Sequence, residues 1–202
     1  MNGAELRRRM GVTSGSRFNA ARRLSAVDRS FNLVLSLVSV AIIALTVVQY
    51  IYEISNDSNR LIALFTIAAS VALLVLTNLN TGNQNMVLSE QLHRCALEVN
   101  EVSRRLDAAL LENDESISSQ CAREYSEILQ KYSVNHEKVD YIEHKLHRRD
   151  EFAAEYSGFL GQLKIIWQSL SVWLAHNRIW IIGLSTLAVC VLILSRSIDL
   201  LP

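Results

Sequence analysis

Two long apolar runs near the start of the chain, residues 31–52 and 61–79, dominate its hydropathy pattern. Neither run contains Asp, Glu, Lys, Arg or His, and only the polar residues 53–60 separate them. At about 1.5 Å of rise per residue, helices over these runs would be roughly 33 and 28 Å long, enough to cross the ~30 Å hydrocarbon core of a bilayer. A helix that packs into a soluble core carries an apolar stripe and is rarely apolar on every side. The pattern therefore predicts a transmembrane helical hairpin.

A third apolar run, residues 179–194, lies near the other end of the chain. Its length is close to the lower limit for a membrane span. Trp173 and Trp180 lie near its start, and tryptophan is enriched at the headgroup level of membranes. We interpret the run as a third, C-terminal transmembrane helix. Its length leaves a re-entrant or interfacial helix open as the alternative.

Between the second and third runs the chain has the periodicity of amphipathic helices. Residues at alternating spacings of three and four mark two heptad seams, one on each side of the polar residues 112–116. The seams are Leu88, Leu92, Cys95, Val99, Val102, Leu106 and Ala109, and then Tyr125, Ile128, Tyr132, Asn135, Val139, Ile142 and Leu146. We expect two helices that pack as an antiparallel helical hairpin or coiled coil. The predicted fold class is all-α, in an integral membrane protein.

Arginine is concentrated ahead of the first apolar run. Residues 1–30 hold seven arginines and two acidic residues, whereas residues 53–60 hold one arginine and two acidic residues. The positive-inside rule then places the N-terminus in the cytosol, and the arginines also suit anionic lipid headgroups. The predicted location is the inner (plasma) membrane. The predicted parts are a basic cytosolic juxtamembrane arm (1–30), the transmembrane hairpin (31–79), a cytosolic helical domain (80–177), and the third transmembrane helix with a short outer tail (178–202).

Composition narrows the class of protein. An Arg-rich start also occurs in mitochondrial transit peptides, but residues 17–31 lead into the first run without Pro or Gly, which favours a juxtamembrane helix continuous with that span. The formal net charge is 0, and residues 80–177 hold more acidic than basic side chains, which does not favour a nucleic-acid partner. Cys95, Cys121 and Cys190 are isolated, so neither a disulfide framework nor a zinc ribbon is indicated.

Each of the first two apolar runs carries a mildly polar stripe on one side of its helix. The candidate pore-lining or helix-packing residues are Asn32, Ser36, Ser39, Thr46, Gln49, Thr66, Ser70 and Thr77. Small and hydroxylated side chains also let membrane helices approach closely, so both interpretations stay open. The absence of charge argues against a proton-coupled transporter. Because two or three helices cannot enclose water, a pore would need a homo-oligomer.

Several short segments resemble a known family. They are Arg22-Arg23-Leu24, residues 91–106 (QLHRCALEVNEVSRRL) and residues 125–141 (YSEILQKYSVNHEKVDY). Together with the tight membrane hairpin, they make the chain similar to the SLATT family, small two-transmembrane effectors found beside nucleotide-signalling genes in prokaryotic conflict systems. The resemblance implies a pore-forming or membrane-disrupting effector of antiviral or abortive-infection defence.

The most specific part of that resemblance is Asn135-His136 with Asp140-Tyr141, which we predict to form a polar contact. An Asn at a heptad core position commonly fixes the register of the helices, which is our leading interpretation of Asn135. His136 would lie just off the seam. Its imidazole would pair with Asp140 one turn on, or it would titrate near neutrality and act as a switch. We favour the structural contact.

No motif indicates an enzyme, because the chain lacks a Gly-rich phosphate loop, a nucleophile elbow and a zinc-protease signature. His144 and His147 lie in a strongly charged stretch, which favours a solvated face over a metal site. We predict no catalytic residue, cofactor or metal. The expected partners are the lipid bilayer, further copies of the chain, and a separately encoded sensor or nucleotide second messenger. The alternative function is a passive membrane tether or scaffold that recruits partners through its cytosolic coiled coil.

Overall fold

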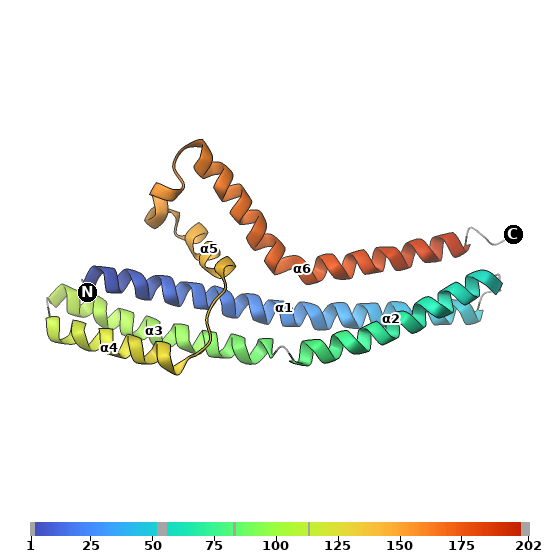
Figure 1. Ribbon diagram of the computed structural model, residues 1–202, viewed down its shortest axis with the longest axis horizontal. Coiled ribbons are helices and arrows are strands. Elements are labelled where there is room, and N and C mark those ends of the chain that lie inside the picture. The colour runs from blue at the N-terminus through green and yellow to red at the C-terminus, as the bar shows by residue number, and fades with distance from the viewer. Residues whose placement is uncertain (1–2, 52–55, 83, 113, 199–202) are drawn as a thin grey trace. The chain divides into compact units, whose positions relative to one another are not determined.

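The computed structural model describes residues 3–51, 56–82, 84–112 and 114–198. Within these ranges every regular element is helical, which confirms the all-α prediction (Figure 1). The elements are α1 (Gly3–Ile51), α2 (Asn56–Gly82), α3 (Asn85–Glu112), α4 (Glu115–Lys131), α5 (Lys138–His147), the 3-10 helix η1 (Arg149–Glu155) and α6 (Gly158–Ile198). The juxtamembrane helix predicted to continue into the first apolar run is therefore present, as α1.

The chain divides into two compact units. We call Met1–Ala26 with Asn85–His176 the polar unit, and Val27–Gln84 with Asn177–Pro202 the apolar unit. Helix α1 contributes residues 3–26 to the polar unit and the rest to the apolar unit. Helix α6 is divided in the same way at His176.

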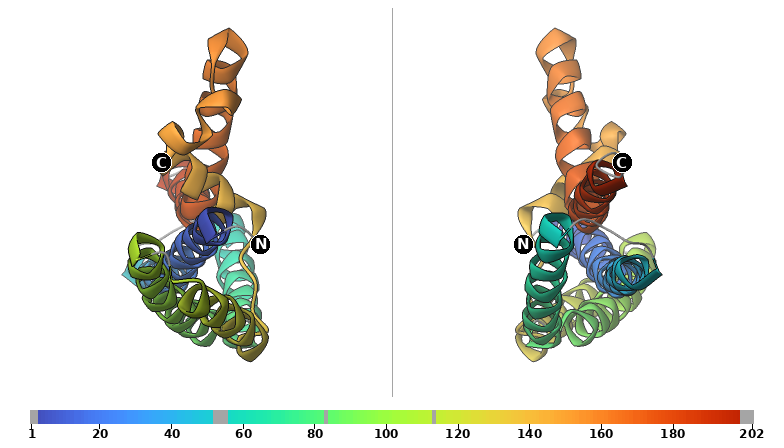
Figure 2. Two further views of the ribbon diagram at one scale, coloured as in Figure 1. Left: turned by 90° about the vertical axis from the view of Figure 1, so that its left-hand side faces the viewer. Right: turned by 90° about the vertical axis from the view of Figure 1, so that its right-hand side faces the viewer.

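In the polar unit, α3 and α4 form an antiparallel hairpin, and the first part of α1 packs against them (Figures 1 and 2). The first predicted seam is confirmed, because all its members from Leu92 to Ala109 are buried. The unit's main core cluster consists of Leu6, Met10, Cys95, Val99, Val102, Leu106 and Cys121. Residues 3–26, which the arginine pattern assigned to a basic arm, thus supply part of a hydrophobic core.

The second predicted seam does not form one helix, and this expectation was wrong. Helix α4 ends at Lys131, residues 132–137 are not helical, and α5 begins only at Lys138. Two local hydrogen bonds favour the break. The Asn135 side-chain oxygen accepts from the backbone N–H of His136, and the Asp140 carboxylate accepts from the N–H of Glu137 at the start of α5. Such side-chain contacts offer the backbone an alternative to the helical ladder.

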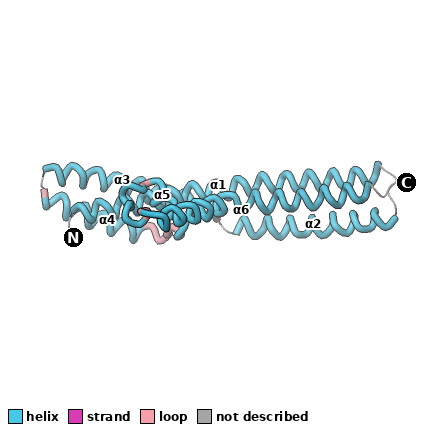
Figure 3. Tube along the Cα trace, turned by 90° about the horizontal axis from the view of Figure 1, so that it is seen from above, coloured by secondary structure: helices cyan, strands magenta, loops and turns pink. Residues whose placement is uncertain are grey.

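The apolar unit contains the second part of α1, α2 and the second part of α6, which run side by side (Figures 1 and 3). Three helices of the described chain contain stretches long and apolar enough to cross a membrane: Gly3–Ile51, Asn59–Leu79 and Gly158–Val189. Leu45 and Ile62 are each only 1% exposed. Most other large apolar side chains of the unit are exposed, which suits a lipid environment.

A glycine allows a close approach between two of these helices. A Cβ atom built on Gly183 of α6 would lie 2.6 Å from a methyl carbon of Val34 on α1. Small residues at such points are what membrane helices use to pack closely. The C-terminal helix therefore packs on α1 within the apolar unit.

Candidate functional site

A buried ion pair joins α1 to α5 inside the polar unit. The Arg23 Nε atom donates to Asp140 Oδ1 at 2.7 Å, and its Nη2 atom donates to Oδ2 at 3.1 Å. The Arg23 side chain is 3% exposed and the Asp140 side chain 0%. Burial would lower the pKa of Arg23, but its hydrogen bond with Asp140 and the charge of that carboxylate together raise the pKa above its usual value. Arg23 therefore stays charged at every physiological pH.

Neighbouring groups hold this pair in place. The Asn19 side-chain amide, one turn before Arg23 on α1, donates to the backbone carbonyl of Asp140 at 3.2 Å. The Asp140 carboxylate also accepts a hydrogen bond from the backbone N–H of Glu137 at 2.9 Å. The Glu137 carboxylate lies 3.1 Å from Arg23 Nη2 at the solvent edge. A packing of α1 and α5 that separated Arg23 from Asp140 would leave a buried charge unpaired, which is strongly unfavourable.

Asn135, His136, Asp140 and Tyr141, the most specific part of the resemblance, make other contacts than the sequence suggested. Asn135 is exposed, so it is not a core residue that sets register. His136 precedes α5, its Nδ1 atom is buried without a hydrogen-bond partner among the described atoms, and burial lowers its pKa. Asp140 pairs with Arg23 where sequence reasoning paired it with His136. The Tyr141 ring packs edge-on against Phe152, with centroids 6.5 Å apart.

Burial divides the eight candidate polar residues of the membrane-length helices into two groups. Thr66 is buried, Ser39 and Gln49 are half-buried, and the Gln49 amide donates to the side chain and carbonyl of Asn59 at 3.0 Å. The other five are exposed on the single chain: Asn32, Ser36, Thr46, Ser70 and Thr77. The six hydroxyls donate to carbonyls three or four residues back on their own helices. Their polarity is thereby partly satisfied within one chain, as lipid requires.

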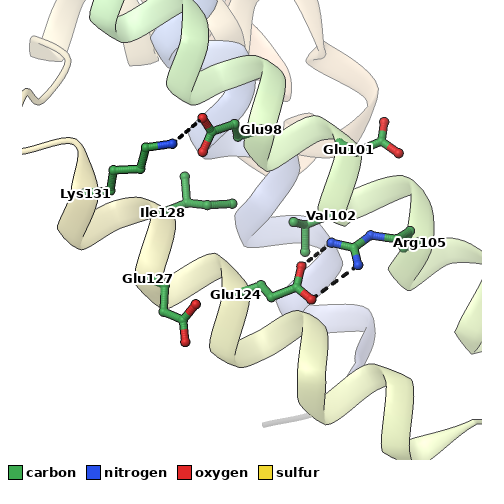
Figure 4. Close-up of a pocket in the computed structure, with 8 residues that line it drawn as sticks. All are labelled: Glu98, Glu101, Val102, Arg105, Glu124, Glu127, Ile128 and Lys131. Atoms are coloured by element: carbon green, nitrogen blue, oxygen red, sulfur yellow. Dashed lines mark hydrogen bonds and ion pairs between the residues drawn. The ribbon is translucent and has the colours of Figure 1, made fainter.

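A charged groove of about 480 Å³ runs between α3 and α4 (Figure 4). Lys131 donates to Glu98 at 2.7 Å, and this bond together with that from the Tyr132 hydroxyl lowers the pKa of Glu98. Arg105 pairs with Glu124 further along the groove. Val102 and Ile128 lie between the two ion pairs, so the groove has an apolar floor and charged walls.

Sequence reasoning included Arg23 among the arginines of the basic arm and in the resemblance, without a partner for it, and it missed Asn19. A family model described as SMODS and SLOG-associating 2TM effector domain family 5 matches residues 3–194. That range covers α1 from its first described residue and nearly all of α6. Comparison with curated proteins and with solved structures found no match.

Proposed function

Because the chain belongs to the SMODS and SLOG-associating 2TM effector domain family 5, we propose that it is a membrane effector whose copies assemble into a pore or disrupt the bilayer when triggered. The setting would be a prokaryotic antiviral or abortive-infection system. The polar unit would lie in the cytosol and the apolar unit in the inner membrane, as the arginine-rich start of the chain favours.

The proposal rests on exposed hydroxyl side chains, which lie on helices whose surface is otherwise mostly apolar. Ser36 and Thr46 on α1, and Ser70 and Thr77 on α2, are exposed on a single chain. Each of these hydroxyls donates to a carbonyl of its own helix, and its remaining hydrogen-bonding capacity suits contacts between copies or a water-filled path. Several copies could bring these positions together, because one chain with three membrane-length helices cannot enclose a channel.

Helix α1 offers a direct route from trigger to membrane, since it belongs to both units. In the polar unit it is held by the Arg23–Asp140 pair, four residues before the apolar unit begins at Val27. A sensor or second messenger that favours a different packing of α1 would change the membrane part of the same helix. A shift between two discrete packings is the usual form of such a switch.

The test is dye release from liposomes that contain the purified full chain at increasing protein density. We expect release that rises more steeply than linearly with density, because oligomers are favoured by mass action. A variant with Leu at the exposed hydroxyl positions (Ser36→Leu, Thr46→Leu, Ser70→Leu, Thr77→Leu) should release none. The matched control changes exposed apolar positions on the same helices (Leu33→Ile, Val40→Leu, Leu64→Ile, Leu74→Ile) and should behave as the wild type. Equal release by both variants would contradict the proposal.

The groove in Figure 4 favours a second candidate function, a passive membrane tether that docks a partner on α3 and α4. Its charged walls around Val102 and Ile128 have the arrangement of a polar rim around an apolar centre that protein-binding surfaces share. A tether should bind its partner and leave liposomes intact. The dye-release experiment therefore separates the two functions.

A further inference from the structure

The first part of α6, residues 158–176, carries a large apolar face that the rest of the described chain leaves uncovered. Residues at alternating spacings of three and four form its centre: Leu160, Leu163, Trp167, Leu170 and Leu174. Phe159, Ile166 and Trp173 flank this row on one side. We call these eight residues the α6 face. Each is between 44% and 80% exposed, although all of them belong to the polar unit.

The opposite side of the same segment contacts its own chain and is the more polar one. Gly161 is buried, and a Cβ atom there would overlap the backbone of Tyr156. Gln168 is half-buried and accepts a hydrogen bond from the Tyr156 hydroxyl at 2.9 Å, with Ile165 and Val172 half-buried on the same side. A helix at the surface of a soluble unit normally turns its most apolar side inward. The reversed arrangement indicates that another molecule covers the α6 face.

The α6 face is large enough to form an interface between proteins. From their exposed fractions, its eight side chains present on the order of 1,000 Å² of apolar surface. The largest apolar patch on a typical monomer is about 300–600 Å². An interface of standard size covers about 800 Å² on each partner. The α6 face alone therefore reaches the area that stable association of two chains needs.

The bilayer does not account for this face. Helix α6 has 41 residues and is therefore about 60 Å long, about twice the thickness of the hydrocarbon core. Gly183 in its second part lies against Val34, near the start of the apolar run of α1, so the second part takes the spanning position in the proposed arrangement. A helix that lies on a membrane surface has a polar side rich in Lys and Arg. Residues 158–176 contain one lysine and no arginine, and that lysine, Lys164, pairs with Glu155.

The spacing of the α6 face is that of a coiled coil. With Leu160 at position a of a heptad, leucine occupies the next two d positions, Leu163 and Leu170. The same register reaches Ile181 and Leu184 in the second part of α6, and both are exposed. Identical helices that enter one membrane with the same topology are parallel to each other. A seam of this kind then packs against the same seam of another copy.

We propose that the α6 face is the surface through which copies of this chain associate, as parallel helices in register. Each Leu163 and each Leu170 would face its counterpart on the neighbouring copy. This surface is separate from the exposed hydroxyl positions of α1 and α2, so association does not require them. The common orientation of the copies rests on the proposed function, which places every chain in one membrane.

The first test is the mass of the full chain in mild detergent, measured by sedimentation over a range of protein concentrations. We expect concentration-dependent association, and at least tenfold more protein should be needed to reach it in the variant Leu163→Gln/Leu170→Gln. The matched control, Leu97→Gln/Leu111→Gln, changes two exposed leucines of α3 and should associate as the wild type does. Thermal unfolding checks that all three proteins are folded. A wild type that stays monomeric, or equal loss of association in both variants, overturns the proposal.

A second test reads the register of the helices. With the native cysteines replaced, Leu163→Cys should form a disulfide-linked dimer in membranes under mild oxidation, because each d position meets its own counterpart. The control Leu111→Cys places a cysteine at a position of α3 that is 86% exposed, and it should stay monomeric. Equal crosslinking at the two positions contradicts a specific contact through α6.

Quenching by brominated lipid tests the bilayer as the alternative occupant. Trp167, kept as the only tryptophan by Trp173→Phe/Trp180→Phe, should be quenched weakly in liposomes, since protein covers it. The reference for full quenching is Leu74→Trp, at an exposed position of α2, in a chain whose native tryptophans are changed to Phe. Equal quenching at the two positions overturns the proposal. Dye release is scored separately, so chains that associate through α6 and release no dye support this contact while contradicting the proposed function.

Discussion

Arg23 and Asp140, 117 positions apart in the sequence, form a two-point ion pair in the interior of the polar unit. The pair fastens α1 to α5 shortly before α1 enters the apolar unit at Val27. Its position makes it the clearest physical link between the packing of the polar unit and the membrane-length part of α1.

Breaking this pair from one side should be costly. In Asp140→Asn, the Arg23 charge stays buried and keeps only Glu137 at the solvent edge, so we expect a loss of about 3 kcal/mol in the free energy of unfolding. For a chain of this size that is roughly a 10 °C drop in Tm, measurable by thermal unfolding in detergent. Glu137→Gln removes only the exposed partner and should cost less than about 1 kcal/mol. Equal effects of the two substitutions would refute the assignment.

Gly15 should resist substitution in a way that Gly11, one turn away, does not. A Cβ atom on Gly15 would overlap the imidazole ring of His144, whereas a Cβ atom on Gly11 would meet only the flexible end of Arg7 at 3.4 Å. We expect Gly15→Ala to lower the free energy of unfolding by about 1–3 kcal/mol. Gly11→Ala should be neutral or stabilising by up to about 1 kcal/mol, because Ala favours helix. Thermal unfolding of both variants measures the difference. Equal melting temperatures would contradict the close contact between Gly15 and His144.

Acid should weaken the polar unit through His144. Burial, followed by the charge of Arg148, lowers the pKa of His144 below 6.5, while Glu151 opposes them. A lowered pKa means that the unfolded chain takes up a proton first as the pH falls. The stability that depends on neutral His144 is therefore complete above pH 6.5 and declines below it. His144→Gln should lose less Tm than the wild type between pH 7.5 and 5.5; an unchanged pH dependence would count against this role of His144.

The contact between α1 and α6 in the apolar unit can be trapped chemically. With the native cysteines replaced, Val34→Cys/Gly183→Cys should form an intramolecular disulfide in membranes under mild oxidation, because the Gly183 position lies against Val34. The control pair Leu33→Cys/Leu184→Cys, at exposed positions, should not form one within a chain. Gel mobility with and without reductant reports the result. Equal crosslinking in both pairs would contradict the packing of the third membrane-length helix on the first.

Hydrophobic periodicity and the length of the apolar runs were enough to predict the membrane-length helices and the buried face of α3. The long uncharged runs became membrane-length helices, and the first heptad seam became the buried face of α3. The packing role of residues 3–26 was missed because polar residues interrupt their apolar stripe. Ser14 and Arg17 are buried there, and the Arg17 guanidinium donates to Cys95 on α3. Two of the arginines that the sequence assigned to lipid headgroups, Arg17 and Arg23, are buried in the polar unit.

The second seam shows the converse limit. Asn135 and Val139 keep the heptad spacing, yet Asn135 lies in the non-helical residues 132–137 and Val139 in α5, because Asn135 bonds to the backbone and Asp140 caps the start of a new helix. The periodicity could not reveal the partner of Asp140, since that partner is on another helix more than a hundred residues away. The role of the exposed hydroxyls likewise depends on neighbouring copies and remains a prediction.

The most direct test of the membrane-effector function is the membrane potential of bacterial cells that express the full chain at graded levels, read with a potential-sensitive dye. We predict depolarisation that rises steeply with expression, and none for the variant with Leu at Ser36, Thr46, Ser70 and Thr77 at the same level in the membrane fraction. An unchanged potential at every level of membrane-inserted wild-type protein would contradict it.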